Sequence, residues 1–323
     1  MSGFGLSEKD SLILSELYLN ARVSLTELAR RVRLSKQAVS YRLNYLEQNK
    51  VIEGYYAITN AYALGKTHYS VFVKYQNMSS EKEEEFMNYL SEHPMVVWTA
   101  YFNGDLDAAF LVWADNIREF EKVFDDINQK FGVFFQEKQF SIATKIEYLK
   151  FAFSKEKKET TSLVFGNCFE RYSLDALSKS LLLALNKNGR ASLVELANKL
   201  GSSPKVIKEK MSGLIKKKII IGFNVKINHR LLGLTHYKIL LKLNDVSQEI
   251  ISKLSTYLKR QSNVIFLVKP IGNHDFEFEL LAPSNEVFHN TIKELRSAFS
   301  KEIKSYNTIV HYYEPKAGQL FSF

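Results

Sequence analysis

The sequence predicts an α+β fold in which two winged helix-turn-helix domains alternate with two ferredoxin-like domains. Apolar residues recur at helical spacing between residues 24 and 48. From residue 67 strands and helices follow in the order β-α-β-β-α-β. The whole pattern then recurs after one gapless shift, which carries Ser24 onto Ser192 and which we call the repeat shift. Because chance does not readily produce such a register, we predict a tandem duplication of one two-domain unit.

The first unit opens with three predicted helices, the first over residues 7–20. Ser24 and Glu27 match a capping box at the start of the second helix, and Ser35 is placed to cap the third. Two apolar stripes would face the core, namely Leu25, Leu28, Ala29 and Val32, and then Val39, Leu43 and Leu46. Residues 51–60 would add a strand pair that forms the wing.

Burial of the second stripe turns the polar side of the third helix outward, as in a helix that enters the major groove. Gln37 suits an adenine edge, whereas Lys36 and Arg42 suit phosphate or guanine. The alternative is a helical hairpin with a solvated face. The candidate DNA-binding residues of this helix are Ser35, Lys36, Gln37, Ser40, Tyr41 and Arg42.

Strands and helices alternate in the rest of the first unit. The predicted strands are 67–75, 95–104, 106–113 and 133–148, and the predicted helices are 80–92 and 117–131. Residues 96–102 are largely apolar on both faces, yet helices cover only one face of such a sheet. The duplicate sheet is the nearest candidate to cover the other face, within one chain or between two, although Glu277 and Glu279 make it less apolar.

The repeat shift also sets the predicted domain boundaries, since residues 67–69 and 235–237 are both Thr-His-Tyr. A polar, charged stretch near residue 155 indicates a linker. The predicted domains are 1–60 and 170–228 for the winged helix-turn-helix pair, 66–149 and 234–317 for the ferredoxin-like pair, and 150–169 for the linker.

The second copy of the third helix is more basic than the first. Lys205 stands where the first copy has Gln37, and Lys208 where it has Ser40. Lysine binds phosphate mainly as a point charge, so this copy suits affinity more than base discrimination. The Glu209 carboxylate would either accept a hydrogen bond from a cytosine amino group or oppose DNA binding. The candidate contacts are Lys205, Lys208, Lys216 and Lys217.

Composition limits the classes of function. The 323 residues suit two or more domains, and the net charge of +9 suits a polyanionic partner. Residues 170–228 hold twelve Lys and Arg against four Asp and Glu. The single cysteine, with no signal-peptide pattern and no apolar run of membrane length, predicts a cytoplasmic protein without a membrane partner. The seven histidines show no metal-binding spacing, so we predict no metal and no cofactor.

Each half resembles a complete subunit of the Lrp/AsnC (feast/famine) transcription regulators. The similarity is carried by residues 24–58, by the ALG and NGDLD motifs at 63–65 and 103–107, and by their copies in the second half. That family joins a winged helix-turn-helix to a sensing domain called RAM, usually once per chain, so the fusion is a departure. The resemblance implies an amino-acid-like effector at the RAM–RAM interface, near Gly104, Asp107, Gly272 and Asp275.

At those four positions the alternative is a structural hairpin, since Gly permits the positive φ of a turn and Asp is a common turn residue. We predict a non-enzymatic, sequence-specific DNA-binding transcription regulator. It would bind double-stranded DNA as a fused pseudo-dimer within one chain, with a homodimer or larger assembly also open. The alternatives are an enzyme that resembles sirohaem decarboxylase, and a partner module that binds single-unit relatives but no DNA.

Overall fold

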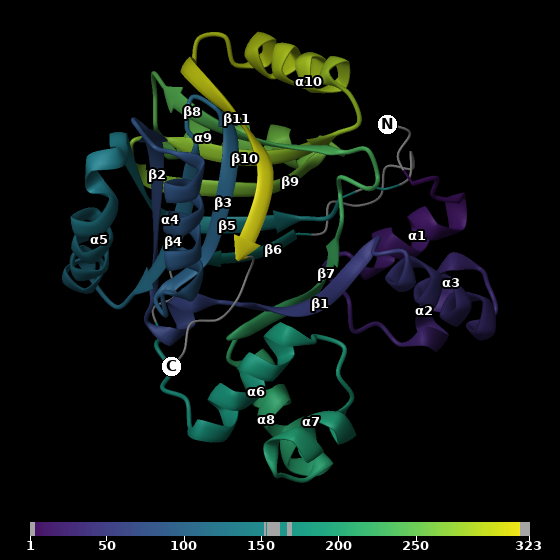
Figure 1. Ribbon diagram of the computed structural model, residues 1–323. Helices are drawn as coiled ribbons and strands as arrows, with labels where there is room; N and C mark the ends of the chain where they lie inside the picture. The colour runs from purple at the N-terminus through teal and green to yellow at the C-terminus, as the bar shows by residue number, and fades with distance from the viewer. Residues whose placement is uncertain (1–3, 152, 154–161, 167–169, 317–323) are drawn as a thin grey trace.

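The computed structural model describes residues 4–151, 153, 162–166 and 170–316, and Figure 1 shows two helical units beside a large curved sheet. The two helical units have the same order of elements. The first consists of α1 (Glu8–Leu17), α2 (Leu25–Val32), α3 (Lys36–Gln48) and β1 (Ile52–Thr59). The second consists of α6 (Ala176–Lys187), α7 (Leu193–Leu200), α8 (Pro204–Lys216) and β7 (Ile220–Ile227). Each is the predicted helix-turn-helix.

The predicted apolar stripes form the cores of these units. Leu28 and Val32 of α2 are buried against Val39, Leu43 and Leu46 of α3. The capping box of α2 is only half present, since Ser24 caps the helix but the Glu27 carboxylate binds two arginines of its own helix. The full box occurs in the second unit, at the N-terminus of α7.

The strand pair predicted within residues 51–60 is wrong, because residues 52–59 form one strand and find their partner in the other half. Strand β1 pairs antiparallel with β7, with Tyr56 opposite Asn224. Asn224 is buried, and its side-chain oxygen accepts from the backbone N–H of Leu19 at 3.0 Å while its amide donates to Tyr56 Oη at 3.1 Å. This two-stranded sheet joins the two helix-turn-helix units of the chain.

The remaining strands form a nine-stranded sheet, all of whose pairs are antiparallel. The first half contributes β2 (Thr67–Tyr75), β3 (Val96–Gly104), β4 (Ala108–Ala114), β5 (Phe135–Leu149) and β6 (Ser162–Gly166). The second contributes β8 (Thr235–Leu243), β9 (Val264–Gly272), β10 (Phe276–Ala282) and β11 (Ile303–Lys316). Since β2 also pairs with β5, the order β2-β4-β3-β11-β8-β10-β9-β5 closes on itself as a barrel.

The long last strands of the two halves close this barrel. Strand β5 pairs with β2 of its own half and β9 of the other, and β11 pairs with β8 and β3 in the same way. The predicted pairing of the two sheets therefore occurs within one chain in this structure. The predicted linker is partly wrong, because residues 162–166 form β6 against β5, while most of the linker lies outside the described residues.

Helices cover the outside of the barrel, as Figure 1 shows. The first half supplies α4 (Ser80–Glu92) and α5 (Ile117–Phe131), and the second supplies α9 (Gln248–Lys259) and α10 (Asn285–Ala298). Short 3₁₀ turns occur at Ala61–Leu64 and Gly132–Phe134. Inside the barrel, an apolar cluster that includes Phe72, Phe102, Leu240 and Ile309 joins the two halves. The inner faces of both sheets thus cover each other.

Candidate nucleic-acid interface

The exposed side of α3 carries most of the predicted contacts. Ser35 caps the helix, because its Oγ accepts a hydrogen bond from the backbone N–H of Ala38 at 3.1 Å. Lys36 and Gln37 are exposed, and Tyr41 is 72% exposed, which is unusual for so large a ring. Ser40 is half-buried beside them. The N-terminal half of α3 thus presents polar atoms and one aromatic ring to solvent.

Arg42 differs from its predicted role, because it is held against its own domain. Its guanidinium donates to Asp10 Oδ1 and to Ser7 Oγ, both at 2.9 Å, and Ser7 is the N-cap of α1. The repeat-equivalent Lys210 forms an ion pair with Asp175, which is the N-cap of α6. At this position the basic residue therefore ties the third helix of each unit to the first.

The face of α8 is equally exposed but more basic. Ser203 caps the helix and Pro204 occupies its first turn, as suits a residue without an N–H. The exposed residues of this face are Lys205, Lys208, Glu209, Lys216 and Lys217. The ammonium of Lys217 lies 5.0 Å from the centre of the Tyr172 ring. We refer to α3 and α8 as the reading helices.

Two repeat-equivalent arginines clasp the helix-turn-helix units together. Arg22 donates to the carbonyl oxygens of Gly189 and Ala191 at 2.7 and 2.9 Å. Arg190 donates to Ala21 O at 2.6 Å. Each guanidinium also lies over an aromatic ring of β1 or β7. Burial and the nearby Arg190 charge lower the pKa of Arg22 below its usual value. We call this reciprocal pair the arginine clasp.

The Gly–Asp turns of the ferredoxin-like units have a clear structural role. Gly104 has φ +137° and Gly272 has φ +145°, and a Cβ at either would lie within 2.8 Å of a backbone oxygen in the long last strand of the other half. Asp107 accepts from the backbone N–H of Tyr75 at 2.7 Å, and Asp275 from that of Leu243 at 2.9 Å. Each aspartate therefore fixes the end of a neighbouring strand.

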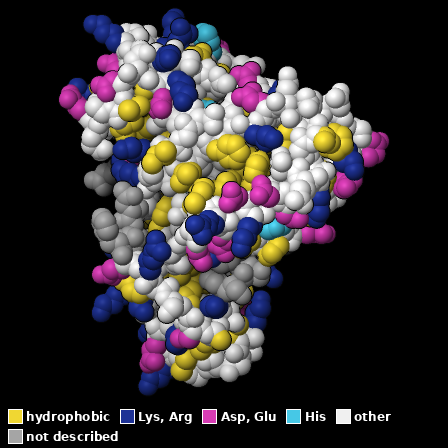
Figure 2. Space-filling view, turned by 90° about the vertical axis from the view of Figure 1, so that its left-hand side faces the viewer, with side chains coloured by type: hydrophobic (Ala, Val, Ile, Leu, Met, Phe, Trp, Pro, Cys, Tyr) yellow, Lys and Arg dark blue, Asp and Glu magenta, His cyan; other side chains and the backbone are white. Residues whose placement is uncertain are grey.

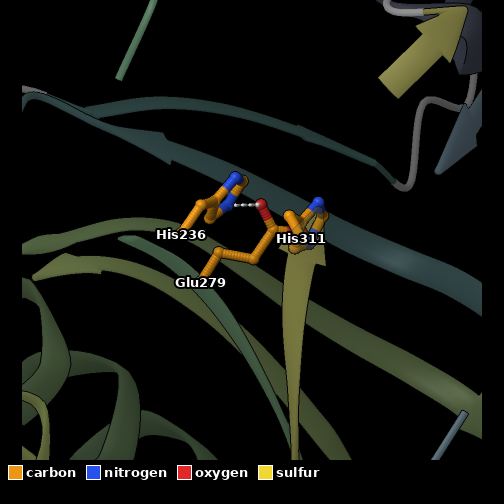
Figure 3. Close-up of side chains that lie close together, drawn as sticks. All are labelled: His236, Glu279 and His311. Atoms are coloured by element: carbon orange, nitrogen blue, oxygen red, sulfur yellow. Dashed lines mark hydrogen bonds and ion pairs between the residues drawn. The ribbon is translucent and has the colours of Figure 1, made fainter. Parts of the chain in front are cut away.

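A buried ionic cluster lies on the inner face of the second sheet, and no local sequence pattern indicates it. Lys238 forms ion pairs with Glu277 and Glu279, each at 3.0 Å. Burial would lower the pKa of Lys238, but the two carboxylates outweigh it and raise that pKa. Glu279 also accepts from His236 at 3.0 Å, and His311 lies beside both, as Figure 3 shows. In the first half, the repeat shift places Ser70, Ala109 and Leu111 at the three ionic positions.

The balance of acidic and basic side chains differs along the chain. Figure 2 shows the face that includes α5, where acidic and basic side chains are interspersed among apolar ones. Residues 170–228, which include α8, carry twelve Lys and Arg against four Asp and Glu. Among the residues that the structure describes, every helix is too short or too polar to cross a bilayer.

Comparison with known proteins agrees with this geometry. A model of winged helix-turn-helix DNA-binding domains matches residues 6–53. The HTH-type transcriptional regulator LrpA of Pyrococcus horikoshii is 33% identical over 128 residues, which are 39% of this chain and 86% of the relative. A proline dehydrogenase transcriptional activator of Rhodobacter capsulatus is 35% identical over 115 residues, 35% of this chain and 75% of the relative.

The chain belongs to the Lrp/AsnC family of transcription regulators. It is a DNA-binding regulator of the helix-turn-helix type, with a second unit in the same polypeptide.

A solved structure shares the two-unit architecture. The crystal structure of a sirohaem decarboxylase superposes with a TM-score of 0.65 over 98% of this chain and 94% of that one, at 12% sequence identity. At that identity the likeness establishes the fold alone.

Proposed function

We propose that the chain regulates transcription as a pseudo-dimer in one polypeptide, with α3 and α8 docked on two half-sites of one duplex. The observation that carries this proposal is the pair of exposed reading helices joined by the β1–β7 sheet and the arginine clasp. Covalent linkage raises the effective concentration of the second helix for its half-site. The half-sites should lie about one helical turn apart or a multiple of it, as for dimeric helix-turn-helix proteins.

The two reading helices have different roles in DNA binding. On α3, Gln37 offers an amide that pairs with adenine, and the exposed Tyr41 ring suits contact with bases or sugars. On α8 the corresponding residues are Lys205 and Glu209, and lysines dominate the exposed face. Because the helices differ, the half-sites need not be palindromic. The first unit would select sequence, and the second would add affinity through the phosphate backbone.

Footprinting on randomised and genomic DNA tests the proposal, followed by affinity measurements at several salt concentrations. We expect one bipartite protected site, with Gln37→Ala reducing discrimination at one base pair by about 1–3 kcal/mol. Gln48→Ala is the matched control, since Gln48 is an exposed glutamine at the far end of the same helix. Absence of a protected duplex at physiological salt would overturn the proposal.

We further propose that an amino-acid-like effector binds near the Gly–Asp turns. Lys74 donates to Gly104 O at 3.3 Å and to Asp107 Oδ1 at 3.2 Å, so its ammonium lies beside the turn and would exchange Asp107 for a ligand carboxylate. Lys242 lies 4.0 Å from Asp275 in the second unit. Calorimetric titration with an amino-acid panel should show binding that Lys74→Gln weakens. The absence of a binding signal for every amino acid in the panel would show that these turns have a structural role only.

The sirohaem decarboxylase likeness concerns the fold and carries no argument about the reaction. Titration of the full chain with an iron porphyrin separates the two functions, because a bound tetrapyrrole gives a Soret band that moves with saturation. We expect no saturable shift, and DNA binding that is unchanged by the porphyrin. A saturable shift together with loss of carboxyl groups from the bound tetrapyrrole would favour the enzyme instead.

A further inference from the structure

Three side chains from three strands bring metal-ligating atoms together inside the second half. His236 lies on β8, Glu279 on β10 and His311 on β11. One ligand atom from each lies within 4.8 Å of the others, as the close-up in Figure 3 illustrates. We propose that these residues bind one divalent transition-metal ion, and that zinc suits them best because imidazole nitrogen and carboxylate oxygen are among its usual ligands.

The hydrogen bonds of His311 are those of a metal ligand. Its Nδ1 bonds to Glu314 Oε1 at 3.0 Å, which leaves Nε2 as the nitrogen with a free lone pair. That Nε2 is buried and has no hydrogen-bond partner among the described residues, and the whole residue is only 9% exposed. A carboxylate that orients a histidine in this way is the usual outer partner of a zinc-bound imidazole.

A third histidine lies beside the cluster. The His229 ring lies 6.2 Å from that of His236, and its buried Nε2 likewise has no partner among the described residues. His229 therefore lies where it would serve as an additional ligand or would contact a ligand of the ion.

The charges around this site favour a divalent cation. Three carboxylates, those of Glu277, Glu279 and Glu314, lie in or beside the cluster, and the ion pairs described there involve one ammonium, that of Lys238. Negative charge is therefore in excess in a largely buried region. A buried ionic cluster is seldom a source of net stability. The first sheet also folds with uncharged residues at the equivalent positions, so folding alone does not require the charges.

Binding requires two small rearrangements. The ring centroids of His236 and His311 are 3.9 Å apart and the rings are stacked at 11°, so their nitrogen lone pairs lie in nearly parallel planes, and one ring must rotate for the lone pairs to converge on one ion. His236 Nε2, which bonds to Glu279, would pass its proton to Nδ1 when it takes the metal. Lys238 can release Glu279 because it keeps Glu277 at 3.0 Å.

The site should occur once per chain. In the first half, the repeat shift places His68, Leu111 and Ala143 at the three ligand positions, and two of these cannot bind a metal. Strand β11 pairs with β3 of the first half as well as with β8. The ion would therefore tie the strand that joins the two halves to two strands of the second, and should raise the melting temperature.

The test uses the untagged full chain, stripped with a chelator and titrated calorimetrically with ZnCl₂. We expect one equivalent to bind, and binding to weaken more than tenfold in His236→Gln and in His311→Gln. His289→Gln is the control, because His289 is exposed on α10 and outside the cluster. Circular dichroism with chelator present checks that each variant is folded.

A second measurement needs no variant. X-ray absorption of the zinc-loaded wild type should show two or three imidazole nitrogens with one or more oxygen ligands, and cobalt substitution should give the absorption of a four- or five-coordinate ion. The proposal is overturned if the wild type takes up no zinc. It is equally overturned if folded His236→Gln and His311→Gln bind as well as the control, or if the zinc spectrum shows no imidazole.

Discussion

Gly104 and Gly272 occupy the same position in the two units, and each lets a strand of one half pass close to the other half. At Gly104 a Cβ would lie 2.8 Å from the carbonyl oxygen of Thr308, and the φ of +137° is one that side-chain-bearing residues rarely adopt. The sequence identified these glycines from their turn motif. It did not reveal the reason for them, because the contacting strand belongs to the other half of the chain.

We expect Gly104→Ala to destabilise the chain by about 1–3 kcal/mol, since both the backbone angle and the cross-half contact are strained. Urea unfolding measures the loss. Gly213→Ala is the matched control, because Gly213 lies in α8 with no neighbour within 4 Å of an added Cβ. There alanine should raise stability by about 0.5–1 kcal/mol. Equal effects from the two changes would contradict the account.

His68 is the repeat-equivalent of His236 but has different surroundings. It is buried among Tyr62, Trp113 and Phe165, and burial lowers its pKa to about 3. The unfolded chain binds a proton at this residue as the pH falls below about 6.5, whereas the folded chain does not. His68 therefore lowers stability progressively from about pH 6.5 down to about pH 3, and has no such effect above that range.

His68→Phe should remove this effect, at about 1.4 kcal/mol per pH unit below pH 6.5. Free energies of unfolding at pH 7.5 and pH 5.0 should then differ by about 2 kcal/mol less than in the wild type. The exposed His289 again serves as control, as His289→Gln. A pH dependence that is unchanged in His68→Phe would contradict the assigned protonation of the folded state.

At the scale of elements, local signals were sufficient for helices and insufficient for strand partners. Helices α4 and α5 begin and end at the predicted residues, since Ser79 and Asn116 cap them and their apolar spacing is regular. The prediction of a strand pair in the wing failed because the partner of β1 is β7, in the other half of the chain. Likewise the exposed face of α3 follows from its helical period, but the inward turn of Arg42 depends on α1.

The basic face of α8 predicts a uniform effect on DNA affinity. We expect the triple change Lys205→Gln, Lys208→Gln and Lys216→Gln to weaken binding to all sequences alike. Each lost phosphate contact should flatten the dependence of log affinity on log salt by about 0.9. The measurement is a fluorescence anisotropy titration at four salt concentrations.

Three exposed lysines of the ferredoxin-like units, Lys122, Lys301 and Lys304, provide the matched triple control for that experiment. Their replacement by glutamine removes the same charge but leaves the reading helices intact, so the salt dependence should stay close to that of the wild type. A sequence-dependent effect of the α8 change would show that this helix also discriminates bases.

At the scale of the whole molecule, the two halves share the order of their helices and main strands but differ in chemistry. The internal repeat predicted the architecture, and the apolar strands predicted that the two sheets cover each other. Closure of the barrel was not predicted, since it depends on the extra length of β5 and β11. The histidine and ionic cluster was not predicted either, because its members come from three strands far apart in sequence.

The arginine clasp should determine how much more tightly one chain binds a complete site than an isolated half-site. In Arg22→Met with Arg190→Met, the lost hydrogen bonds should loosen the two helix-turn-helix units. Affinity for the complete site should then fall by about tenfold or more, while affinity for an isolated half-site stays unchanged. Arg118→Met on the exposed part of α5 is the control. An equal loss on half-sites would instead indicate damage to the reading helices.

The shared strands also bear on how the polypeptide is made. While the ribosome synthesises it, the leading half emerges with the edges of β3 and β5 open, and their partners, β11 and β9, are encoded only in residues 264–316. Open strand edges invite pairing with other nascent chains. The speed of translation through the second half therefore sets how long the open strand edges of each nascent chain can pair with those of another chain.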